Sequence, residues 1–159
     1  PITTGELAEI IKRNVPLKVR KEKNPCALCA RMRRGRLHKA MAEEGITRVA
    51  LGHHLDDAVE TFFLSLFYES RLSCFHPVTR LDRMGVTQIR PLLYVGEEVI
   101  RDTAARLSLP VVHNICPANG STRRQEIKEL IVRLSRTYPG VKNSVFRAMQ
   151  RLPLEGWHD

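Results

Sequence analysis

A short apolar segment, a polar turn and an apolar helix succeed one another in the middle of this chain. This unit limits the possible folds more than any other feature. Residues 48–52 form the apolar segment, which ends in glycine. The segment 58–68 then has large apolar side chains at the spacing of a buried helix face, namely Val59, Phe62, Phe63, Leu66 and Phe67. Two more apolar runs, over 88–93 and 111–113, flank a helical segment over 96–107. Strands that alternate with helices predict an α/β fold in which helices flank a parallel sheet.

Further helices are predicted on either side of this unit. The first long one opens at a pair of cysteines and is ended by Gly45, and the last two are basic helices separated by Pro139 and Gly140. Glycine and proline are the residues that most often interrupt a helix. The predicted helical segments are 6–14, 27–44, 122–138 and 142–151.

The composition indicates a globular protein. The 159 residues are 43% apolar and contain only nine glycines and nine prolines, which argues against disorder. We expect a single domain, with an α/β part over about 24–115 and a basic helical tail over about 121–151. No run of eighteen apolar residues occurs and the amino end has no leader pattern, so the sequence predicts a cytoplasmic protein without a membrane partner. The chain begins with Pro1, which suggests a trimmed or truncated amino end.

The charge of the chain favours polyanionic partners. The 26 lysines and arginines exceed the 17 acidic residues and leave a formal net charge of +9. A basic surface that only contacts solvent explains this total equally well. Five cations, however, lie within nine residues after Cys29, and this spacing favours a phosphate-binding face. They are Arg31, Arg33, Arg34, Arg36 and Lys39.

The cysteines predict a metal site rather than disulfides, because no secretory signal accompanies them. Cys26 and Cys29 stand three residues apart at a predicted helix start, where the helix dipole favours thiolates, and Cys116 follows much later. Three thiolates fit a 4Fe-4S cluster with one open iron better than a closed zinc site, which needs four ligands. Zinc completed by Cys74 or a histidine, and reduced thiols without metal, are the alternatives. We expect Cys74 to be a buried small hydrophobe.

A second polar group occupies the turn between the first predicted strand and its helix. The turn reads Gly52-His53-His54-Leu55-Asp56-Asp57. Ligands of open parallel sheets bind at the carboxyl ends of strands, and adjacent carboxylates there can hold Mg²⁺ and so position a nucleotide. The alternative is that Asp56 or Asp57 caps the helix and the histidines are polar residues of a loop, and spacing alone supports it equally well.

Four motifs in order resemble one known family. They read CALCARMRRGRLHKAMAEEG, VALGHHLDDAVETFFLSLFYE, IRPLLY and CPANGSTRRQEIKELI. The chain is similar over about 24–138 to the tRNA two-thiocytidine synthetase branch of the PP-loop ATP pyrophosphatases. The resemblance implies an adenine-nucleotide alpha-hydrolase fold and an ATP-dependent tRNA sulfurtransferase. In that family ATP adenylates the C2 oxygen of a cytidine in the anticodon loop, and a 4Fe-4S cluster supplies the sulfur.

The resemblance also implies roles for individual residues and a sulfur donor as a second partner besides tRNA. Thr61 and Arg90 stand at motif positions without an assigned role. Cluster ligands are Cys26, Cys29 and Cys116. Nucleotide-binding residues are Gly52, His53, His54, Asp56 and Asp57, of which the two aspartates are catalytic. Residues that hold tRNA phosphates are Arg31, Arg33, Arg34, Arg36, Arg123 and Arg124.

One motif of the family does not occur in this sequence. The SGGxDS-type phosphate loop is absent, and the chain contains no Gly-Gly pair. Three strands alone would also expose a sheet edge. We therefore expect a fragment, a degenerate paralogue or an obligate oligomer, completed by a homodimer partner or by a missing amino-terminal segment. A non-catalytic RNA-binding module with a structural metal and another PP-loop enzyme, such as a thiouridine synthetase, are the alternative functions.

Overall fold

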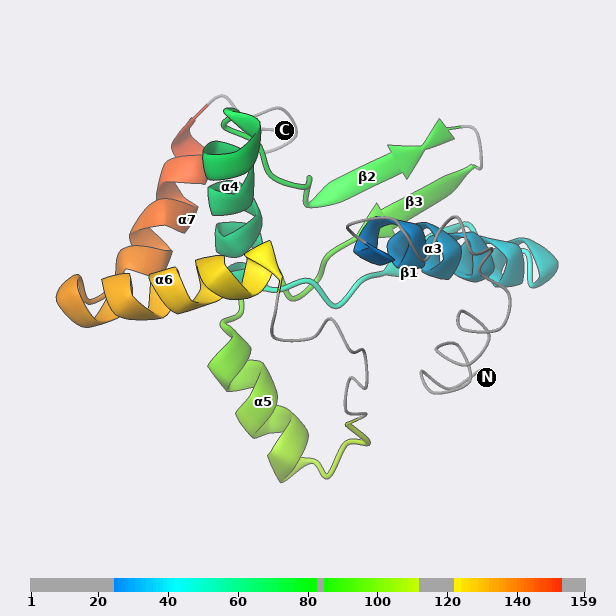
Figure 1. The fold of residues 1–159 in the computed structure, drawn as a ribbon. Helices are drawn as coiled ribbons and strands as arrows, with labels where there is room; N and C mark the ends of the chain where they lie inside the picture. The colour runs from blue at the N-terminus through cyan, green and yellow to red at the C-terminus, as the bar shows by residue number, and fades with distance from the viewer. Residues whose placement is uncertain (1–24, 83–84, 112–121, 153–159) are drawn as a thin grey trace. The chain divides into compact units, whose positions relative to one another are not determined.

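The computed structural model describes residues 25–82, 85–111 and 122–152, and side chains from residue 30 onward (Figure 1). The chain divides into two compact units. One comprises residues 1–46 and 111–120, and the other comprises 47–110 and 121–159. The expectation of a single domain with a basic tail stays a prediction.

In the first unit the described structure is mainly a single helix, α3 (Pro25–Glu43). Gly45 follows it with a φ of +65°, a conformation that glycine adopts without strain, and the Ile46 amide donates to Met41 O over 2.8 Å. The predicted helix over 27–44 and its glycine stop are confirmed. The helix predicted over 6–14 lies outside the described residues.

The described part of the second unit contains a three-stranded sheet in the order β1-β3-β2. β1 (Arg48–Ala50) pairs in parallel with β3 (Val86–Ile89), while β2 (Val78–Leu81) pairs antiparallel with β3. The predicted parallel pairing is confirmed for β1 and β3. The sheet is nevertheless mixed, because β2, which was not predicted from the sequence, runs antiparallel to β3. Its short segment of half-exposed residues has too weak an apolar pattern.

Two predicted strands differ in extent from the structure. The strand expected over 88–93 ends at Ile89, because Pro91 has no amide donor for a sheet. The strand expected over 111–113 is not formed at Val111, and residues 112–113 lie outside the described part of the chain.

Four helices lie in the described residues of the second unit. They are α4 (Leu55–Glu69), α5 (Glu97–Arg106), α6 (Arg123–Thr137) and α7 (Val141–Arg151). The predicted helices over 58–68, 96–107, 122–138 and 142–151 are therefore confirmed. Gly140, with a φ of +84°, forms the turn between α6 and α7.

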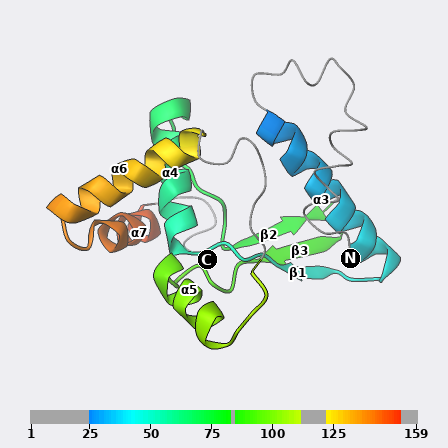
Figure 2. The same cartoon turned by 60° about the horizontal axis from the view of Figure 1, so that its bottom comes forward.

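The core of this unit is formed where α6 and α7 pack on α4 (Figure 2). Apolar side chains three or four residues apart on each helix face the same interior. The contributing residues include Ala58, Val59, Phe62, Ile127, Ile131, Phe146 and Met149. This packing holds the first turn of α4, which carries the polar motif, against both basic helices.

Replacing Met149 with alanine is expected to lower the free energy of unfolding by about 2–5 kcal/mol. Its side chain is 0% exposed, so the substitution leaves a cavity between α4 and α7. Urea unfolding followed by circular dichroism measures the change. Val132→Ala is the control, because Val132 is 44% exposed on α6 and its loss is expected to change stability by less than about 0.5 kcal/mol. Equal losses in both variants would contradict this description of the core.

Candidate nucleotide site at the start of helix α4

The polar turn lies between β1 and α4, at the carboxyl ends of the two parallel strands. The Leu51 amide donates to Ile89 O over 2.9 Å, which extends the pairing of β1 and β3 by one residue. The Leu55 amide donates to Val95 O over 3.0 Å and fixes the start of α4. Ligands of open α/β sheets bind at this edge.

His54 and Asp57 cap the first turn of α4 together. His54 Nδ1 accepts a hydrogen bond from the Asp57 amide over 3.4 Å, and Asp57 Oδ2 accepts one from the His54 amide over 3.0 Å. This reciprocal pair is a capping box built on histidine instead of serine or threonine. The alternative that an aspartate of this turn caps the helix is thus correct for Asp57, whereas the N-cap role of His54 was not predicted from the sequence.

Asp56 points into the protein, and its side chain is only 8% exposed. Its Oδ1 accepts a hydrogen bond from Lys142 Nζ over 2.5 Å, and its Oδ2 accepts one from the Glu97 amide over 2.7 Å. Burial alone would raise the pKa of Asp56, but the bonds from Lys142 and Glu97 outweigh burial and lower it below its ordinary value. Asp56 is therefore ionised at neutral pH.

Arg124 spans three residues of α4. Its Nη1 lies 2.9 Å from Glu60 Oε2 and 3.3 Å from Asp57 Oδ1, and its Nη2 donates to Thr61 Oγ1 over 3.1 Å. Burial raises the pKa of Glu60, and the guanidinium opposes that rise. This guanidinium, predicted to hold tRNA phosphate, is thus already paired within the protein.

His53 and Arg90 both contact the ring of Phe75. The imidazole centroid of His53 lies 4.9 Å from the ring centroid, and Arg90 Cζ lies 4.9 Å from it as well. Arg90 Nη1 donates to His76 O and to Thr79 Oγ1. Burial, aided by the Arg90 charge, lowers the pKa of His53, so its ring is neutral at neutral pH.

Each of these two side chains keeps one buried nitrogen without a hydrogen-bond partner among the described residues. The atoms are His53 Nδ1 and Arg90 Nε. Buried polar groups without partners are rare, and a ligand can satisfy them. Phe75 was not predicted as a site residue, because a lone aromatic after a cysteine gives no signal of its role.

The comparison with known families decides the classification. The sequence profile described as the PP-loop domain matches residues 7–134, which is most of the chain. The chain belongs to the PP-loop domain family. The recognition of this family and of the α/β fold class from the four motifs is confirmed.

Individual relatives of this PP-loop chain are tRNA-modifying enzymes. It is 38% identical over 152 residues to the tRNA-cytidine(32) 2-sulfurtransferase of Pseudomonas putida, and the match covers 95% of this chain and 54% of the relative. It is 40% identical to the enzyme of the same name from Teredinibacter turnerae, with 95% and 49% covered. The chain thus spans about half the length of the curated relatives it matches.

A solved structure is also similar to this PP-loop chain. It is the U34-tRNA thiolase NcsA from Methanococcus maripaludis with its 4Fe-4S cluster. The TM-score is 0.64 and the identity is 28%, over 81% of this chain and 44% of that one.

Both aspartates of the turn in this PP-loop chain are bonded to protein groups. All four carboxylate oxygens of Asp56 and Asp57 accept hydrogen bonds or lie in ion pairs with protein groups. Within the described ranges no group of three His, Cys, Asp or Glu residues is arranged to hold a metal ion. The predicted Mg²⁺ site at these two carboxylates therefore stays a prediction.

The predicted cluster ligands fall at the limit of the described residues. The backbone of Cys26 and Cys29 lies in the first turns of α3, at positions three apart that share one face of a helix. Their side chains and the whole of Cys116 lie outside the described residues. Cys74 packs against the core and its Sγ donates to Ala58 O over 3.5 Å. Burial raises the pKa of the Cys74 thiol to about 11, so it is a poor metal ligand.

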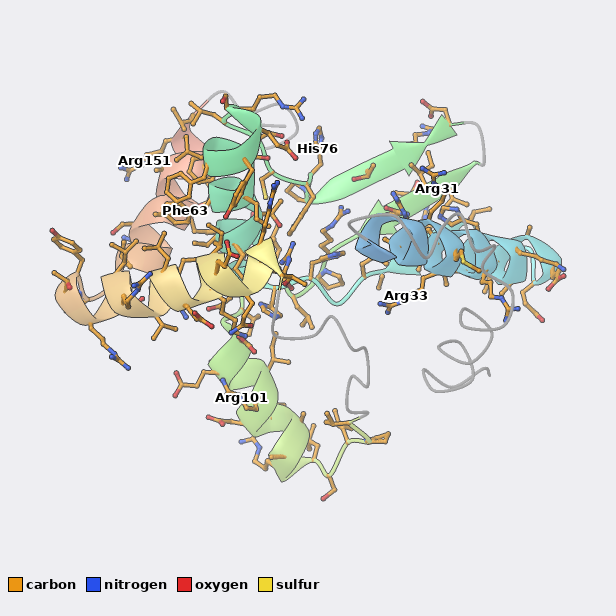
Figure 3. The ribbon with its side chains drawn as sticks, in the orientation of Figure 1. Arg31, Arg33, Phe63, His76, Arg101 and Arg151 are labelled. Carbon is orange, nitrogen blue, oxygen red and sulfur yellow. The ribbon has the colours of Figure 1, made fainter. Side chains whose placement is uncertain are left out.

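The remaining predicted tRNA-binding arginines lie on two helices. Arg31 and Arg33 project from α3 (Figure 3), and Arg34 and Arg36 are also exposed there. Arg123 lies over the ring of Tyr68 with its Cζ 4.5 Å from the ring centroid.

No described helix is both long and apolar enough to cross a membrane.

Proposed function

We propose that this chain works in an ATP-dependent tRNA sulfurtransferase that replaces the C2 oxygen of a cytidine in the anticodon loop with sulfur. The observation that carries the proposal is the family match over residues 7–134 together with curated 2-sulfurtransferase relatives at 38–40% identity. Such an enzyme takes sulfur from a separate donor and works in the cytoplasm, where tRNA and ATP are found. A homodimer or a longer chain would complete the nucleotide domain.

The ATP-binding part of the proposal places the nucleotide against Gly52, His53 and His54. The unpaired Nδ1 of His53 and Nε of Arg90 support it, because they offer hydrogen-bonding atoms beside the turn. In this proposal Asp56 and Asp57 shape the turn through their bonds to protein groups and remain candidate catalytic residues. Mg²⁺ is expected to arrive with the ATP phosphates, since it commonly binds through substrate phosphates and few protein ligands.

The proposed cluster ligands are Cys26, Cys29 and Cys116. A 4Fe-4S cluster bound by three thiolates would supply sulfur at its open iron. Two observations support this ligand set: the similar thiolase NcsA was solved with its 4Fe-4S cluster, and Cys26 and Cys29 share one helical face, which is compatible with a common metal centre.

The tRNA part of the proposal predicts weaker and less salt-dependent binding when Arg31 and Arg33 are both changed to glutamine. Each phosphate contact that is lost should lower the slope of log affinity against log salt by about 0.7–0.9. Filter binding of tRNA at several salt concentrations measures this slope. Arg101→Gln on α5 is the control (Figure 3), because Arg101 is also exposed but lies outside the arginine-rich helix. An unchanged slope in the double variant would remove α3 from the tRNA interface.

A second candidate is thiolation of uridine. The structural similarity to a U34-tRNA thiolase favours it, although the identity of 28% is lower than that to the cytidine enzymes. One thiolation experiment distinguishes cytidine thiolation from uridine thiolation. The protein, purified without oxygen, is incubated with tRNA, ATP and sulfide, and the digested nucleosides are analysed by mass spectrometry.

We expect 2-thiocytidine in this digest. Detection of 2-thiouridine instead of 2-thiocytidine would support uridine thiolation, the second candidate. Absence of both nucleosides, with tRNA binding intact, would favour the non-catalytic RNA-binding module instead.

A further inference from the structure

Lys142 connects the last described helix to the polar turn across 86 residues of sequence. It lies in the first turn of α7, and its Nζ donates to Asp56 Oδ1 over 2.5 Å. The lysine side chain is 40% exposed, whereas that of Asp56 is 8% exposed. An ammonium group at the surface therefore pairs with a carboxylate that is almost fully buried.

The other oxygen of Asp56 caps a different helix. α5 begins after Gly96, which has no side chain to bond the first free amides of the helix. Asp56 Oδ2 accepts from the Glu97 amide over 2.7 Å and so replaces the missing cap. A negative charge at this position also interacts favourably with the dipole of α5.

The neighbouring charges do not duplicate the bond from Lys142. Lys128 on α6 is directed to Glu97, with Nζ 2.8 Å from Oε2, and Arg124 is directed to Glu60 and Asp57. His54 Nδ1 lies 3.9 Å from Asp56 Oδ2, beyond hydrogen-bonding distance. Among the described residues, Lys142 is thus the cation that bonds Asp56 directly.

The family profile ends before this lysine. The match covers residues 7–134, whereas α7 spans Val141–Arg151. An element outside the matched region therefore fixes a residue of the motif turn. The core contact of Phe146 and Met149 with α4 holds α7 close enough for this bond.

We propose that Lys142 is a positioning residue, which holds Asp56 in the orientation that joins the start of α4 to the start of α5 and so sets the shape of the nucleotide-binding turn. This inference rests on the proposed function for its catalytic consequence. Lys142 itself does not contact substrate in this proposal. Its effect reaches the nucleotide only through Asp56.

The test compares Lys142→Met, Lys142→Arg, Asp56→Asn and the double variant Asp56→Asn/Lys142→Met. Lys142→Met should lower kcat for tRNA thiolation by on the order of tenfold to a hundredfold, because small displacements of reacting groups have effects of that size. The KM for tRNA should stay unchanged, and Lys142→Arg should restore most of kcat. The double variant should be no slower than Asp56→Asn, because Lys142 acts through the same carboxylate. Arg147→Met, an exposed cation on the same helix, is the matched control and should keep kcat.

An additive loss in the double variant, or no rescue by arginine, would overturn the positioning role. A second readout keeps the inference testable if the protein thiolates no tRNA. Lys142→Met should speed hydrogen exchange of the Glu97 amide, which Asp56 protects, and Arg147→Met should not. Unchanged exchange at Glu97 would overturn the inference on its own, whereas missing thiolation in the wild-type protein would count only against the proposed function.

Discussion

Cys26→Ser is expected to remove the iron–sulfur cluster and with it all tRNA thiolation. The protein purified without oxygen should contain about four irons and four acid-labile sulfides per chain, and the variant close to none, because a serine hydroxyl does not replace a cluster thiolate. Serine is well tolerated at the beginning of a helix, so α3 should persist. Iron and sulfide assays together with circular dichroism measure both parts of this expectation.

Cys74→Ser is the matched control for this experiment. The Cys74 thiol is partly buried against the core, and burial raises its pKa to about 11, so it is not expected to bind iron. The variant should keep its iron content. Loss of iron from Cys74→Ser, or unchanged iron in Cys26→Ser, would contradict the assignment of the cluster ligands.

Asp56→Leu is expected to have the largest effect on stability of any substitution in the polar turn. It removes the partner of Lys142 and the cap of α5 together. Breaking a buried ion pair by removing one partner destabilises by about 3–5 kcal/mol, and we expect roughly 3 kcal/mol here, because Lys142 can turn toward solvent. Urea unfolding at neutral pH measures the loss.

The pH dependence of this loss has a defined sign. The folded-state pKa of Asp56 lies below its ordinary value of 3.8, so the ionised carboxylate stabilises the folded protein above that pH. The stabilisation should fall as pH decreases through the folded-state pKa, and the difference between wild type and Asp56→Leu should therefore shrink below about pH 4. Asp82→Leu is the control, because Asp82 pairs with Arg80 at 83% exposure and should cost at most about 1 kcal/mol. A difference that grows in acid would contradict the ionised state of Asp56.

Helices of this chain were predictable because their apolar spacing matches the core that they form. Phe62 on α4, Ile131 on α6 and Phe146 on α7 all meet in one cluster. β2 was missed, because Val78–Leu81 is a short edge strand whose side chains are half exposed. Such a strand is specified by its neighbour β3 rather than by its own pattern.

The candidate site was predictable in its location but not in its connections. The strand–turn–helix pattern placed Gly52–Asp57 at a sheet edge, and the capping alternative correctly described Asp57 but not the N-cap residue His54. Arg124 bonds Asp57, which lies 67 positions away in the sequence, and Lys142 bonds Asp56, which lies 86 positions away. Local sequence patterns carry no information about such distances, since packing of α6 and α7 on α4 creates them.

The proposed thiolation is tested most directly by following AMP and thionucleoside in one reaction. Radiolabelled ATP, tRNA and sulfide are incubated with the anaerobically purified protein, and AMP and 2-thiocytidine are quantified over time. Because adenylation precedes sulfur transfer in the proposed reaction, AMP and 2-thiocytidine should form in equal amounts, and neither should form without tRNA. Formation of 2-thiocytidine without ATP, or release of ADP in place of AMP, would contradict the proposed reaction.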